Sequence, residues 1–120
     1  MSDFMKGVDL FNDGAYFEAH DIFEDLWMES DQNDKDLYQG LVQISVGSYH
    51  LISGNYSGAL SQYQKGIKKL ENYRTTEKNI NLEKFLIEFK PFIEKIIMFN
   101  SKKISNIEIT KIPTIEKYKH

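Results

Sequence analysis

Apolar residues recur at helical spacing through most of the chain, and glycines or polar stretches separate the runs. The first run lies between Ser2, a candidate helix cap, and Gly14, a residue type that tolerates the left-handed conformation at a helix end. The second run covers about residues 15–29. Because only a tight turn fits between the two runs, we expect an antiparallel helical hairpin.

The next two runs predict a second pair of helices. The third helix begins after the polar loop 28–36, with Asn33 or Asp34 as a candidate cap, and ends near Ser53. It is apolar on most of its circumference, which indicates a central, buried helix. A fourth helix is predicted over about residues 56–73.

An internal repeat links these two pairs at an offset of forty residues. It takes the form glycine, aromatic, alanine, aromatic, at the same spacing in each copy: Gly14, Tyr16, Ala19 and Phe23, then Gly54, Tyr56, Ala59 and Tyr63. This pattern resembles the packing positions of tetratricopeptide-type repeats. Two copies are too few for an open solenoid, so we predict two hairpins packed on each other.

The remainder predicts a fifth helix and an extended tail. Asn81 can cap the helix, and Pro91 should kink or divide it. Residues 101–120 change to isoleucines at closer spacing, which favours an extended segment laid over the bundle. The predicted fold class is therefore an all-α compact bundle of about five helices, with one domain over residues 1–100 and a docked tail over residues 101–120.

Composition narrows the function classes. There is no cysteine, which excludes disulfides, thiolate metal sites and thiol nucleophiles. Residues 1–60 carry eleven acidic and two basic residues, whereas residues 61–120 carry seven acidic and thirteen basic residues. This asymmetry predicts either pairing of the halves within one molecule or head-to-tail association into a homo-oligomer.

Several partners and compartments are not expected. The lysines of the fourth predicted helix lack the accompanying pattern of arginines with aromatics, and the isoelectric point is about 5.6, so nucleic acid is not an expected partner. No run is apolar enough for a membrane span, and the N-terminal residues lack the features of a secretory signal. A cytoplasmic protein is the expectation.

Candidate chemistry lies along the second and third helices. His20 and Glu24 are four residues apart, so both side chains can reach one point beside the helix. His50 lies two turns beyond Gln43 on one face of the third helix. If these faces pack together, His20, Glu24 and His50 could bind a divalent metal, zinc or iron, with Gln43 orienting a ligand or holding a water.

Two other interpretations remain open. The same side chains could form a buried hydrogen-bonded network that fixes helix register, or a metal-free pocket for a small molecule. Trp27 and the tyrosines are expected in the core, with a stacking platform for bases or sugars as the alternative: Tyr16, Tyr49, Tyr56 and Tyr63.

Three segments give the chain a resemblance to a bacterial and archaeal all-helical family, domain of unknown function 309. They are Phe11–Trp27 (FNDGAYFEAHDIFEDLW), Leu37–Leu60 (LYQGLVQISVGSYHLISGNYSGAL) and, more weakly, Asn79–Phe85 (NINLEKF). The resemblance implies a compact helical bundle without an established activity. Similar proteins have been labelled predicted metal-dependent hydrolases.

The family's polar motifs fall on defined positions of this chain. The first covers residues 18–21, where Asp21 replaces the glutamate of the family, and continues to Glu24 and Trp27. The second falls on Gln39, Gly40, Gln43 and His50.

Two functions follow as hypotheses. The first is a metal-dependent hydrolase with Glu18 or Asp21 as the base, and with Gln39, Gln43 and Trp27 around the pocket. The second is a non-enzymatic interaction or scaffold module that acts through a helical-hairpin surface or a homodimer. The substrate is not predicted.

Overall fold

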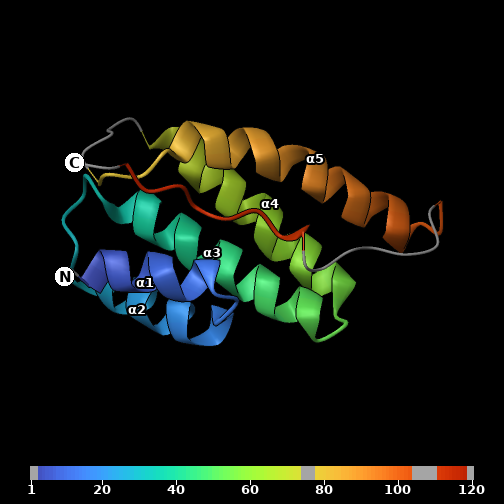
Figure 1. The fold of residues 1–120 in the computed structure, drawn as a ribbon, viewed down its shortest axis with the longest axis horizontal. Coiled ribbons are helices and arrows are strands. Elements are labelled where there is room, and N and C mark those ends of the chain that lie inside the picture. The colour runs from blue at the N-terminus through green and yellow to red at the C-terminus, as the bar shows by residue number, and fades with distance from the viewer. Residues whose placement is uncertain (1–2, 74–77, 104–110, 119–120) are drawn as a thin grey trace.

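The computed structural model describes residues 3–73, 78–103 and 111–118 of the chain. Five α-helices account for most of these residues and confirm the predicted all-α class (Figure 1). Their bounds are α1 (Asp3–Asn12), α2 (Tyr16–Glu29), α3 (Lys35–Ile52), α4 (Tyr56–Asn72) and α5 (Leu82–Asn100). Each helix packs on the next along the chain. The predicted cap Ser2 lies outside the described residues.

Both predicted hairpins turn at a glycine in the left-handed conformation. Gly14 has φ +84° and Gly54 has φ +83°. In each turn the residue after the glycine donates its N–H to a carbonyl five residues back: Ala15 to Leu10 at 2.9 Å and Asn55 to His50 at 2.8 Å. These bonds satisfy carbonyls at the helix end that would otherwise lack a partner. The repeated turn is therefore confirmed in the backbone.

The repeat extends into the packing. The two alanines and the two aromatic residues that follow the turns are all fully buried: Ala19, Ala59, Phe23 and Tyr63. Gly7 and Gly47, which also lie forty residues apart, each face one of these rings. A Cβ at either glycine would lie 2.7 Å from the ring, of Phe23 in one hairpin and of Tyr63 in the other. Each hairpin thus crosses closely because a glycine faces an aromatic ring.

Helix caps differ in part from the prediction. Asp34 precedes α3 but makes no capping bond. Its carboxylate instead accepts a hydrogen bond from the Tyr73 hydroxyl at 3.1 Å and pairs with Lys78 at 3.1 Å. Asn81 caps α5 as predicted, because its side chain accepts from the Lys84 N–H at 3.1 Å. Asn55 caps α4 in the same way.

Helix α5 continues through Pro91 from Leu82 to Asn100, so a division of this helix at the proline is wrong. Proline removes the hydrogen bond to the carbonyl of residue 87, one turn earlier. Both Pro91 and Ile87 are exposed, so water can satisfy that carbonyl. The solvent-facing position of the proline explains why the helix tolerates it.

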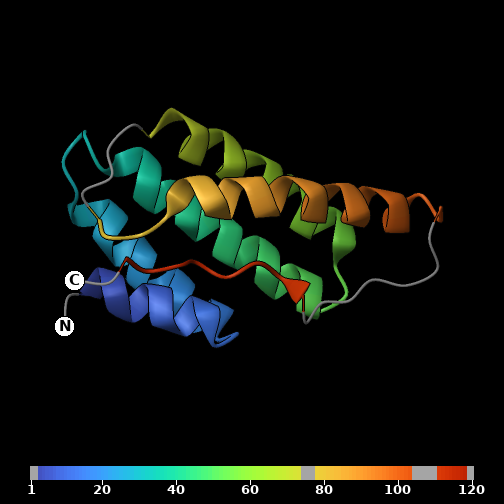
Figure 2. The ribbon, with the colours of Figure 1, turned by 45° about the horizontal axis from the view of Figure 1, so that its top comes forward.

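Residues 111–118 run back along the bundle between α1 and α5 and across α3 (Figures 1 and 2). Ile112 and Ile115 are buried in the same core as the helices. Residues 104–110 of the predicted tail lie outside the described residues, and the division into domain and tail stays a prediction. No helix in the described part of the chain is long and apolar enough to cross a membrane.

Candidate functional site

Helices α2 and α3 lie antiparallel, and two contacts fix their register. The rings of Phe17 and Tyr49 are 5.6 Å apart near one end of the pair, and the Lys35 ammonium lies 6.0 Å from the Trp27 ring centre near the other. His20 lies between these two contacts along α2, and Gln43 lies between them along α3. The expected association of these two helices is present.

His20 stands between two carboxylates. Its Nε2 is hydrogen-bonded to Glu24 Oε2 at 3.2 Å. Because a carboxylate only accepts, Nε2 carries the proton in the neutral imidazole, which leaves a lone pair on Nδ1. Asp21 Oδ1 lies 3.2 Å from Nδ1, but the angle does not make a hydrogen bond, so Nδ1 is buried without such a partner among the described residues.

Gln43, on helix α3, also carries a buried polar atom without a hydrogen-bond partner among the described residues. Its Oε1 is buried and has no hydrogen-bond partner within the described part of the protein. Buried polar atoms are nearly always paired, so each exception calls for an explanation. Gln43 Oε1 is an acceptor, and His20 Nδ1 is an acceptor in the tautomer that carries its proton on Nε2. A hydrogen-bond donor or a cation would satisfy them.

His50 has neighbours of its own in the last turn of α3. Its Nδ1 is 3.5 Å from Nδ2 of Asn55, in the turn toward α4. Among the residues that the structure describes, no group of three or more histidine, aspartate or glutamate side chains is placed to hold a metal ion. The three predicted ligands are therefore not gathered at one point in this structure, and metal binding by His20, Glu24 and His50 stays a prediction.

The other predicted site residues have separate surroundings. Glu18 is exposed, as is Asp21, which adjoins His20. Gln39 and Trp27 are half-buried. The Lys35 ammonium group lies over the Trp27 ring, so Trp27 packs partly against a cation and not only against core residues. Catalytic roles for Glu18 and Asp21 stay predictions.

The sequence patterns did not predict an exposed apolar patch beside His20. We define it as Phe17, Tyr49 and Ile52, whose exposed fractions are 51%, 43% and 44%. The Phe17 ring is 5.6 Å from the His20 ring and joins the patch to the polar atoms. Tyr49 was expected in the core. That expectation is wrong, because 43% of this residue is exposed to solvent. The position of Phe17, off the apolar face of its helix, could have indicated the patch.

Comparison with known proteins identifies the family. No curated protein and no solved structure matches this chain. The family model described as Domain of unknown function (DUF309) matches residues 4–62, which include the first two motifs that carried the resemblance. The weaker third motif, residues 79–85, falls outside the match. The match confirms the resemblance to the DUF309 family for residues 4–62 of the chain.

Proposed function

We propose that this protein binds a small cationic ligand on the α2/α3 face, beside His20. The observation that carries the proposal is that two buried atoms, His20 Nδ1 and Gln43 Oε1, have no hydrogen-bond partner among the described residues. A cation or an ammonium group would satisfy either atom, and an apolar ligand would satisfy neither.

The surroundings supply the remaining chemistry for a cation. Glu24 accepts from the imidazole and orients it, as second-layer carboxylates do for ligating histidines. Asp21 adds negative charge 3.2 Å from Nδ1. The exposed rings of Phe17 and Tyr49 offer electron-rich faces, which attract ammonium groups.

A metal-dependent hydrolase is the narrower form of this proposal, and it follows from the family resemblance. It requires a third ligand, for which His50 is the residue that the sequence offers. Zinc would then lower the pKa of a bound water and supply the nucleophile. Glu18 or Asp21 would take the role of base.

The experiment follows the imidazole nitrogen resonances by NMR while Zn²⁺, and separately spermidine as an organic cation, is added. His20→Gln removes the proposed acceptor, and His50→Gln is the matched control on a histidine outside the acceptor pair. Binding that is lost only in His20→Gln supports the cation site. Zinc binding lost in both variants supports the three-ligand set and justifies a hydrolase screen on the zinc-loaded protein. Unchanged His20 resonances with both cations would overturn the proposal.

The second candidate function is the interaction module. A specific observation favours it, because an extended peptide segment already occupies a groove on this bundle. That segment is the chain's own residues 111–118, held by α1 and by the start of α5.

A further inference from the structure

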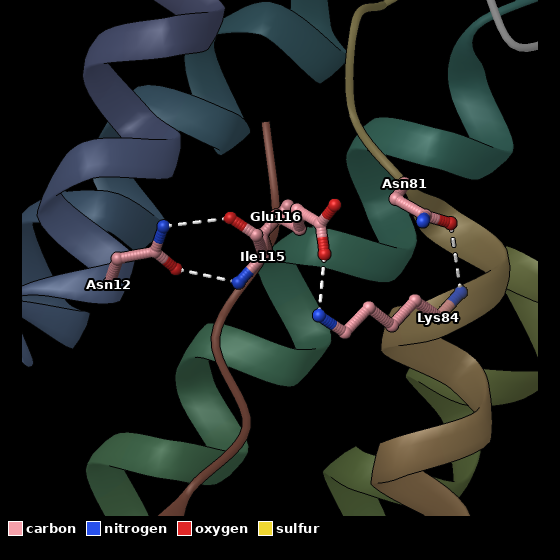
Figure 3. A network of polar contacts seen from close by, with 5 residues as sticks. All are labelled: Asn12, Asn81, Lys84, Ile115 and Glu116. Carbon is pink, nitrogen blue, oxygen red and sulfur yellow. Dashed lines mark hydrogen bonds and ion pairs between the residues drawn. The ribbon is translucent and has the colours of Figure 1, made fainter. Parts of the chain in front are cut away.

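Asn12 holds the backbone of Ile115 with both ends of its amide. The Asn12 Nδ2 donates to the Ile115 carbonyl at 2.8 Å, and the Ile115 N–H donates to Asn12 Oδ1 at 2.7 Å (Figure 3). This pair of bonds recognises an extended peptide unit and is independent of the side chain. Asn12 lies at the end of α1, 103 residues away in sequence.

The stretch before α5 continues this backbone recognition. The Asn81 N–H donates to the Glu116 carbonyl at 2.8 Å, and the Tyr118 N–H donates to the Asn79 carbonyl at 2.8 Å. An isolated antiparallel bridge joins Ile80 to Lys117. The segment is therefore bound on one side by α1 and on the other by residues 79–81, as a strand is bound in β-augmentation.

Side chains add selectivity to these bonds. Ile112 and Ile115 are 6% and 1% exposed and act as two apolar anchors three residues apart. Glu116 pairs with Lys84 of α5 (Figure 3), and Lys117 pairs with Asp9 of α1. The groove thus selects an extended segment with two apolar anchors followed by an acidic and a basic residue.

The docked segment touches several helices of the bundle. Figures 1 and 2 show the segment between α1 and α5 and across α3, which are the alternate helices of the bundle. The Phe11 and Phe85 rings, 5.9 Å apart, join α1 to the start of α5. Residues 111–118 thus complete the packing between these helices.

We propose that this groove is a peptide-binding site and that a second copy of the chain supplies its occupant, by exchange of residues 111–118. The exchanged segment would make the same contacts in the partner, so an assembly forms without any new surface. The charges agree, because Lys117 of the basic half pairs with Asp9 of the acidic half. This inference rests on the second candidate function, the interaction module.

The test uses two full-length variants. Ile112→Asp with Ile115→Asp spoils the segment and leaves the groove intact, whereas Asn12→Ala weakens the groove and leaves the segment intact. Light scattering after size-exclusion chromatography should find each variant monomeric alone and a one-to-one dimer on mixing. A fluorescent peptide of residues 111–120 should bind the first variant. Adding Asn12→Ala to that variant should weaken peptide binding by about tenfold, because two hydrogen bonds are lost.

The outcomes test peptide binding by the groove and exchange between copies separately. Peptide binding without a mixed dimer overturns exchange between copies and leaves the interaction module standing. A first variant with native helical content that binds neither the peptide nor the second variant overturns both. If that variant loses its helical circular dichroism, the milder Ile112→Ala with Ile115→Ala replaces it. Wild-type protein followed by light scattering up to millimolar concentration needs no substitution: a monomer at every concentration also overturns exchange between copies.

Discussion

The Ser48 hydroxyl lies 2.7 Å from the Tyr63 hydroxyl, and both side chains are fully buried between α3 and α4. The positions forty residues earlier are Val8 and Phe23, also fully buried. The two hairpins therefore use the same geometry with different chemistry. One has two hydroxyls that satisfy each other, and the other has none.

The first prediction tests whether the hydroxyl pair of Ser48 and Tyr63 stabilises the second hairpin. Tyr63→Phe should destabilise the protein by about 1–3 kcal/mol, because it leaves the buried Ser48 hydroxyl without a partner. Ser48→Val with Tyr63→Phe recreates the pair of the first hairpin and should recover most of that loss. Urea unfolding of the two single variants and the double variant measures the coupling. If the double variant instead loses the sum of the two single losses, the hydroxyl pair has no coupling energy and the prediction is wrong.

The second prediction concerns alkaline pH. Burial raises the pKa of Tyr63 well above its ordinary value of 10.0. Above that value the unfolded state loses the Tyr63 proton while the folded state keeps it, so stability falls as pH rises. The slope from this one group is at most about 1.4 kcal/mol per pH unit.

Urea unfolding from about pH 9 to pH 11 tests the slope. The Ser48→Val, Tyr63→Phe double variant is the control, and its stability should fall less steeply than that of the wild type. Parallel curves would assign the alkaline loss to other groups.

The third prediction compares two glycines. Gly47→Ala would place a Cβ 2.7 Å from the Tyr63 ring at a helix crossing, and overpacking of this kind costs about 1–3 kcal/mol. Gly54→Ala meets no atom within 4 Å, and its cost comes only from φ +83°. That cost is about 1 kcal/mol. Thermal unfolding should therefore rank Gly47→Ala below Gly54→Ala, and the reverse order would contradict the close crossing.

The fourth prediction concerns how much residues 111–118 contribute to the free energy of unfolding. Ile115→Ala should lower the free energy of unfolding by about 2–5 kcal/mol, as for other buried isoleucines. Ile87→Ala is the matched control, since that side chain is 63% exposed and should change stability little. Chemical denaturation provides both values. A small loss at Ile115 would show that the segment contributes little to the core.

The sequence predicted only those contacts of the candidate site that form within a single helix. His20 and Glu24 meet because four residues make one helical turn, and that contact needs no other part of the chain. The position of His50 depends on how α3 enters the turn toward α4, and the structure joins it to Asn55 instead. Exposure of Phe17 and Tyr49 depends on which helix faces are covered, which spacing alone does not specify.

By itself, the sequence determined the helices and their turns, because apolar spacing, Gly14 and Gly54 act within a few residues. It also indicated the two-hairpin repeat. Only the tertiary structure decided the glycine–ring crossings, the unpartnered acceptors of His20 and Gln43, and the Asn12 bonds to Ile115. These depend on groups distant in sequence, and an asparagine at a helix end has the same local appearance whether or not a distant peptide reaches it.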